Sequence, residues 1–103
     1  QEPLLHRVTF AEVNAGGIPN PVWLDTRFPV EFRQNGIPGA INIPLNEIRD
    51  ASAVLDKKRE YIVYCQTGRR SSAAAFLLSQ RGIRAHLLEG GLSAMNDLQE
   101  LSV

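Results

Sequence analysis

Short apolar runs alternate with segments of helical pattern along the whole chain, and this alternation constrains the fold more than any other feature. The apolar runs have the length and the β-branched or aromatic composition of strands, and we place them at residues 6–8, 22–25, 40–43, 61–64 and 85–88. Strands that alternate with helices are typical of a parallel sheet, because each crossover connection passes through a helix. The sequence therefore predicts an α/β fold with a mainly parallel sheet of four or five strands.

Helices are expected between these strands, and two of them have clear end signals. Thr9 and Glu12 have the spacing of a capping box. After the strand at 61–64 we expect a helix with a serine N-cap that ends at Gly82 and turns Phe76, Leu77 and Leu78 toward the core. The other helical segments are expected at residues 29–34, at 45–48 together with 54–55, and from about residue 92.

Length and composition describe one ordinary globular domain. The 103 residues are 44% hydrophobic, and eleven basic residues balance eleven acidic ones. A chain without net charge has no overall attraction to a polyanion, so no nucleic-acid partner is expected. No stretch has the length of a membrane span, and residues 1–6 lack the blocks of a signal peptide. We expect a single domain over residues 1–103, cytoplasmic and without a membrane partner. The missing initiating Met favours a processed chain or a piece of a longer protein.

Cys65 is the only cysteine, which excludes an internal disulfide, a Cys-x-x-Cys redox pair and a cysteine-rich zinc site. The two histidines, His6 and His86, lie too far apart in the sequence to suggest a local metal motif. We therefore expect no metal and no cofactor.

The position of Cys65 makes it a candidate nucleophile. It ends an apolar strand and is followed by a polar, basic segment that packing does not explain: Gln66, Thr67, Gly68, Arg69, Arg70 and Ser71. A loop between a strand and a helix can aim its N–H groups and the positive end of the helix dipole at the sulfur. No acidic residue lies between positions 61 and 88, so a lowered thiol pKa is expected. The alternative is a small buried residue that only ends a strand.

Asp25 and Arg27 follow the second strand just as the candidate loop follows the fourth. Ligands of parallel sheets bind at the carboxyl ends of strands, so Asp25 and Cys65 are expected at the same crevice. A structural ion pair that orders the loop is the simplest role for Asp25 and Arg27, which we assign as supporting residues. Arg70 is open to two roles, binding an anionic substrate or bracing the loop through Asp25 or Glu89.

Four motifs in this order resemble a single-domain rhodanese over about residues 5–98. They are residues 22–27 with 31–32, residues 37–44, residues 64–71 and residues 88–91. The resemblance implies a rhodanese-like three-layer α/β/α fold. It also implies a sulfurtransferase in which Cys65 takes a sulfane sulfur from thiosulfate or a similar donor, holds it as a persulfide, and passes it to cyanide or a thiol. Gln66 through Ser71 would then form the anion-binding loop.

The chain departs from the usual family pattern in places. Asn35 and Gly36 replace a common Gly-His pair, and Leu92 and Met95 replace tryptophans often found after the Gly-Gly pair. The loop also resembles rhodanese modules that are joined to cyclic-nucleotide-binding domains in bacterial proteins, which favours fusion to another domain in a longer chain.

Two other functions use similar residues. A cysteine-dependent phosphatase or arsenate reductase needs arginine six positions after the cysteine, where this chain has Ser71. A non-catalytic sensing or binding module would keep the same shape, although inactive copies usually lack the cysteine. Sulfur transfer is therefore the prediction of the sequence.

Overall fold

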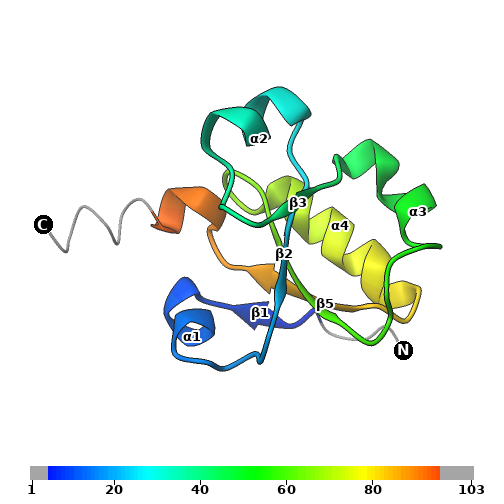
Figure 1. The fold of residues 1–103 in the computed structure, drawn as a ribbon, viewed down its shortest axis with the longest axis horizontal. Coiled ribbons are helices and arrows are strands. Elements are labelled where there is room, and N and C mark those ends of the chain that lie inside the picture. The colour runs from blue at the N-terminus through cyan, green and yellow to red at the C-terminus, as the bar shows by residue number, and fades with distance from the viewer. Residues whose placement is uncertain (1–4, 96–103) are drawn as a thin grey trace, which may run out of the picture.

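The computed structural model describes residues 5–95, which form a five-stranded sheet with helices on both faces (Figure 1). The strands run parallel in the order β1-β5-β4-β2-β3. The predicted α/β fold with a mainly parallel sheet is confirmed. The strands are β1 (Arg7–Val8), β2 (Val22–Asp25), β3 (Ile41–Asn42), β4 (Glu60–Tyr64) and β5 (Arg84–Leu88).

The helices connect successive strands and include the predicted capping box. The Thr9 hydroxyl accepts the Glu12 N–H at 3.1 Å, and the Glu12 carboxylate accepts the Thr9 N–H at 2.8 Å. Residues 91–95 are also helical, and the chain beyond them lies outside the described residues. The helices are α1 (Phe10–Asn14), α2 (Pro29–Asn35), α3 (Ile48–Ala51) and α4 (Arg69–Gln80), with a 3-10 helix, η1 (Leu45–Glu47), before α3.

Two helix predictions are wrong in their bounds. The helix after Cys65 has Gly68 rather than a serine as its N-cap, because Gly68 adopts a left-handed φ of 109° that starts the helix two residues before Ser71. Residues 54–55 form a turn and not a helix, and the Val54 side chain is 84% exposed.

Alternation along β4 divides the core into two layers. Tyr61 and Val63 pack with α3 and α4 on one face, and Ile62 and Tyr64 pack with α1 and residues 91–95 on the other. Burial on both faces explains why β4 carries no charge from Tyr61 to Tyr64. Of the predicted core face of α4, Leu78 is buried and Leu77 packs beside it, whereas Phe76 is half-buried outside both clusters.

The strand order places a switch point between β2 and β4. The chain leaves β2 toward β3 on one side and leaves β4 toward β5 on the other, so the two connections diverge. Asp25 and Tyr64 are register partners at the carboxyl ends of these strands. A crevice is expected at such a point, and it holds the candidate site. No helix in the described part of the chain is long and apolar enough to cross a membrane.

Candidate active site

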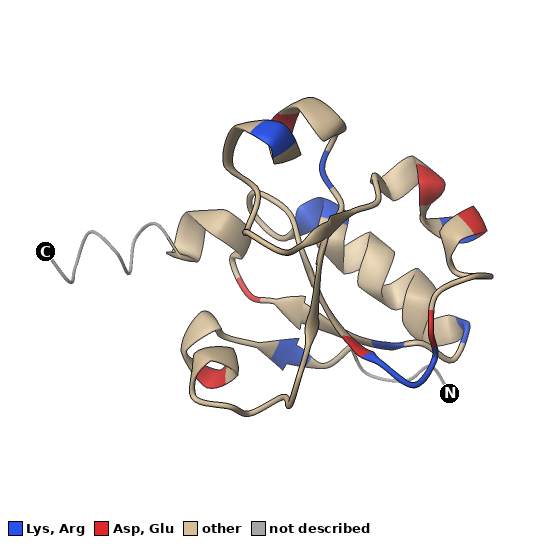
Figure 2. Cartoon of the chain, in the orientation of Figure 1, with Lys and Arg blue, Asp and Glu red and all other residues tan. Residues whose placement is uncertain are grey.

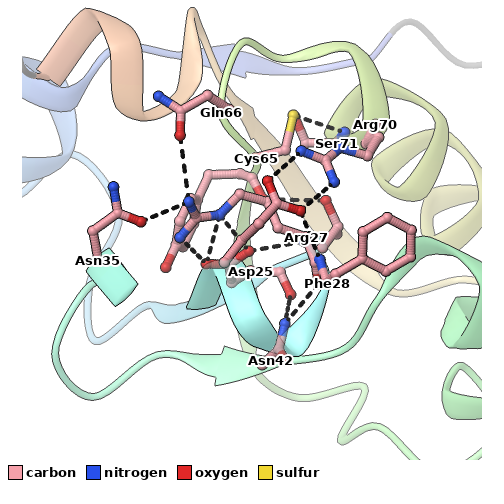
Figure 3. Close-up of polar contacts among 12 residues, drawn as sticks. Asp25, Arg27, Phe28, Asn35, Asn42, Cys65, Gln66, Arg70 and Ser71 are labelled. Carbon is pink, nitrogen blue, oxygen red and sulfur yellow. Dashed lines mark hydrogen bonds and ion pairs between the residues drawn. The ribbon is translucent and has the colours of Figure 1, made fainter. Parts of the chain in front are cut away.

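Cys65 directly follows β4, the central strand, and its residue is only 1% exposed. Three groups of the loop contact its sulfur. The N–H groups of Gly68 and Ser71 donate to Sγ at 3.1 and 3.4 Å. The Ser71 hydroxyl lies 3.2 Å from Sγ, and Figure 3 shows Ser71 beside Cys65. The loop therefore closes around the sulfur as the sequence predicts.

These contacts favour the thiolate. Burial of the sulfur opposes ionisation, but the hydrogen bonds from Ser71, Gly68 and the Thr67 backbone outweigh it and hold the pKa of Cys65 below its ordinary value. The expected direction of the pKa shift thus follows from backbone and hydroxyl donors.

The sulfur also acts as the cap of α4. Gly68 has no side chain to accept the free N–H groups of the first turn, and Ser71 is the third residue of the helix. Its N–H, which a capping side chain would normally accept, donates to Cys65 Sγ instead. The hydrogen bonding of the first turn of α4 and the protonation state of the Cys65 sulfur are therefore coupled.

The carbonyls of the same loop are held by residues 91–95. The Leu92 N–H donates to the Cys65 carbonyl and the Ser93 N–H to the Gln66 carbonyl, both at 3.0 Å. Gly91 permits this approach, because a Cβ there would lie 2.4 Å from the Cys65 oxygen. The carbonyls of Cys65 and Gln66 thus point toward residues 91–95, and the N–H groups of Gly68 and Ser71 point toward the sulfur.

A buried ion pair supports the loop from β2. The Arg27 guanidinium donates to both oxygens of Asp25, with Nη2 at 2.8 Å, and both residues are almost fully buried. The same guanidinium donates to Asn35 at 2.8 Å and to the Gln66 side chain at 3.3 Å (Figure 3). Asp25 raises the pKa of Arg27 although burial opposes its charge. The pair therefore links β2 to Gln66, the first residue after Cys65.

Arg70 pairs with Glu31 of α2, and the predicted partners Asp25 and Glu89 are wrong. Its guanidinium donates to the two Glu31 oxygens at 2.8 and 3.0 Å. These bonds lower the pKa of Glu31 to about 2 and raise the pKa of Arg70. Figure 2 shows both signs of charge on α2 near the basic start of α4. The local absence of acidic residues in the sequence did not anticipate this carboxylate, because it comes from a helix 39 residues away.

The remaining predicted loop residues are oriented differently. Thr67 and Arg69 are exposed, and the structure gives neither side chain a hydrogen-bond partner among the described residues.

The Tyr64 hydroxyl accepts the Ile37 N–H at 2.9 Å and so ties the segment after α2 to the site. Tyr64, Glu31 and Gly91 were not predicted as site residues, because each acts through a contact distant in sequence.

His6 and His86 meet although 80 residues separate them. Their Nδ1 atoms lie within hydrogen-bond distance, and His86 Nε2 lies 3.0 Å from Glu60. Within residues 5–95, however, no group of three His, Cys, Asp or Glu side chains has an arrangement that could hold a metal ion.

Alkylation should report the lowered thiol pKa. Because the folded loop stabilises the thiolate, iodoacetamide should react with a pH midpoint below that of an unstructured cysteine peptide. Ser71→Ala removes the hydroxyl contact and should raise the midpoint, whereas Ser79→Ala on the same helix should leave it unchanged. A parent midpoint equal to that of the peptide would show that burial dominates.

Comparison with known proteins agrees with this geometry. The family model for the rhodanese-like domain matches residues 11–98. The chain is 43% identical over 72 residues to thiosulfate sulfurtransferase PspE of Escherichia coli, covering 68% of this chain and 69% of PspE. It is 36% identical over 72 residues to a sulfurtransferase of Allochromatium vinosum, covering 69% and 67%.

A solved structure also matches. A rhodanese-related protein from Thermoplasma volcanium has a TM-score of 0.83 at 31% identity, covering 90% of this chain and 92% of that chain. The relatives support sulfurtransferase activity in general. The resemblance predicted from the four motifs is confirmed, and the chain belongs to the rhodanese-like domain family.

Proposed function

We propose that this chain transfers a sulfane sulfur from thiosulfate or a similar donor to cyanide or a thiol through a persulfide on Cys65. The observation that carries the proposal is the buried sulfur of Cys65 with N–H donors from Gly68 and Ser71. A persulfide is more acidic than a thiol, so a site that favours a thiolate also favours the persulfide anion.

The reaction has two balanced steps. The Cys65 thiolate attacks the outer sulfur of thiosulfate, a bond forms between the two sulfurs, and sulfite leaves with the electron pair of the broken S–S bond. The acceptor then attacks the outer sulfur of the persulfide, and Sγ leaves as the thiolate. Neither step requires a metal or an external oxidant. With no second cysteine in the chain, the acceptor is an external nucleophile.

Loop spacing argues against phosphate chemistry. Ser71 stands where a cysteine-dependent phosphatase has its arginine, and its hydroxyl contacts the sulfur at 3.2 Å. The Arg70 side chain is paired with Glu31. Neither residue is therefore suited to clamp the oxygens of a phosphoryl group.

An assay with thiosulfate and cyanide tests the proposal. We expect thiocyanate formation that saturates with both substrates in a ping-pong pattern, and negligible release of phosphate from an aryl phosphate. Phosphate release without thiocyanate would contradict the proposal, and the absence of both products would assign the chain to a sensing or binding role.

Replacing Arg69 and replacing Arg70 should have different effects, one on kcat/KM for thiosulfate and the other on Tm. Arg70→Ala removes the contacts to Glu31 and Phe28, so we expect Tm to fall by about 4–8 °C, the effect of roughly 1 kcal/mol in a domain of this size. Arg69 is exposed and free to attract an anionic donor. Arg69→Ala should lower kcat/KM for thiosulfate roughly two- to fivefold with little change in Tm. The same pattern of effects in both variants would refute this division.

We also propose that residues 1–103 act as one domain in the cytoplasm, with fusion to another domain in a longer chain. Size-exclusion chromatography of the chain and fractionation of cells that express the full-length protein test these points.

A further inference from the structure

A pocket of about 300 Å³ adjoins the candidate site, lined by Thr26, Phe28, Leu45, Asn46 and Arg70. Two of its walls belong to the site itself. Thr26 donates to the Tyr64 carbonyl through its N–H at 3.0 Å and its hydroxyl at 3.2 Å, directly before Cys65. Arg70 is the second residue of α4, between Gly68 and Ser71, whose N–H groups donate to the sulfur. Two residues of the pocket lining are therefore neighbours in sequence or hydrogen-bond partners of the segment that carries Cys65.

The surface of this pocket is largely apolar. Phe28 and Leu45 provide carbon surface, and the Phe28 residue remains 58% exposed. The Arg70 guanidinium stacks over the Phe28 ring at 5.8 Å from its centroid (Figure 3). An aromatic ring left this exposed beside a pocket has apolar surface that a ligand can bury.

Among the described residues that line the pocket, no cation is unpaired. Glu31 binds both Nη atoms of Arg70, and its Oε1 also accepts the Phe28 N–H at 3.1 Å. Arg70 is the one cation among the lining residues that the structure describes, and its charge is thus balanced within 3.0 Å. An acidic ligand beside Arg70 would be repelled by the Glu31 carboxylate, and it would find no unpaired cation on the described lining to balance its own charge.

Pocket size indicates an organic ligand. Thiosulfate and cyanide are small, and neither has an apolar body to place against Phe28 and Leu45. Pockets for small organic molecules begin at roughly 300 Å³ and are mostly apolar with a few polar groups, here Thr26 and Asn46.

We propose that the acceptor for the Cys65 sulfur is a small organic thiol with an apolar body and no acidic group, seated against Phe28 and Leu45. This inference rests on the proposed sulfur transfer. The acceptor thiolate attacks the outer sulfur of the persulfide, and the bond between that sulfur and Sγ breaks. The acceptor leaves as its own persulfide, and Sγ keeps the electron pair as the thiolate.

Three acceptors test the proposal with thiosulfate as donor and sulfite release as the readout: 2-phenylethanethiol, the anionic 2-mercaptoethanesulfonate, and cyanide. We expect kcat/KM for 2-phenylethanethiol to exceed that for the anionic thiol by about tenfold or more after correction for thiolate fraction. Phe28→Ala should lower the ratio of kcat/KM for 2-phenylethanethiol to that for cyanide by roughly five- to twentyfold.

Two further variants sharpen the result. Val30→Ala is the matched control, since Val30 lies in α2 two residues after Phe28, is 53% exposed, and is not among the described residues that line the pocket. It should leave the ratio unchanged. Asn46→Trp should fill the mouth of the pocket and lower the ratio without touching the core, because Asn46 is exposed.

The outcomes distinguish the inference from the proposed function. No sulfite release with any acceptor would defeat the proposed function itself. Turnover with cyanide, combined with equal use of both thiols and an unchanged ratio in Phe28→Ala, would overturn the acceptor inference alone. Turnover with cyanide and no use of either small thiol would also overturn it, in favour of a protein thiol.

Discussion

Cys65→Ser is expected to lower thiocyanate formation by about a thousandfold or more while the protein stays folded. Serine has nearly the volume of cysteine, and its oxygen can accept the N–H groups of Gly68 and Ser71 that the sulfur accepts now. Its hydroxyl, however, forms neither a nucleophilic anion near neutral pH nor a persulfide. The measurement is the steady-state rate with thiosulfate and cyanide.

The melting temperature serves as the control for this variant. A Tm near that of the parent would show that the lost activity comes from chemistry, since the cap of α4 would be preserved by the hydroxyl. Thiocyanate formation at a rate near that of the parent would remove Cys65 from the reaction and with it the proposed mechanism.

Gly91→Ala is expected to disrupt the site from the opposite side. The added Cβ would lie 2.4 Å from the Cys65 carbonyl oxygen and 2.8 Å from that of Gln66, so residues 91–95 and the loop must move apart. The hydrogen bonds from Leu92 and Ser93 would lengthen. We expect a loss of roughly 2–4 kcal/mol of stability and at least a tenfold fall in kcat/KM for thiosulfate, measured by thermal melting and by the thiocyanate assay.

Gly82→Ala is the matched control for Gly91→Ala. Gly82 has a φ of 80° and Gly91 one of 60°, so both variants incur the cost of a left-handed alanine. A Cβ on Gly82 would meet nothing within 4 Å. Gly82→Ala should therefore cost only about 1 kcal/mol and leave sulfur transfer near the parent rate. Equal losses in both variants would show that backbone strain, and not the clash with the loop, causes the effect.

The sheet and the position of the candidate nucleophile were predictable because both depend on local sequence. The apolar run before Cys65 indicates a buried strand, and the glycine and serines after it indicate a turn into a helix. In a parallel sheet the carboxyl ends of strands share one edge, so the neighbourhood of Asp25 and Cys65 followed from the strand assignments alone. The structure places both there.

The charge balance of the site was not predictable in the same way. Counting charges between residues 61 and 88 predicts an acid-free surrounding, yet Glu31 neutralises Arg70 from a different helix. The N-cap was also misassigned, because Ser71 has the residue type of a cap but its hydroxyl contacts the sulfur instead. Pairings of this kind depend on how the elements pack, which residue type and spacing do not encode.

The most direct test of the account is the mass of the intact chain after incubation with thiosulfate and removal of the donor. We predict a gain of one sulfur atom on the parent protein, lost again after cyanide is added and absent from Cys65→Ser. The Gly68 and Ser71 N–H groups that stabilise the thiolate should also stabilise this persulfide, so it should persist through the measurement. An unchanged mass in the parent protein, or the same gain in Cys65→Ser, would contradict the persulfide mechanism.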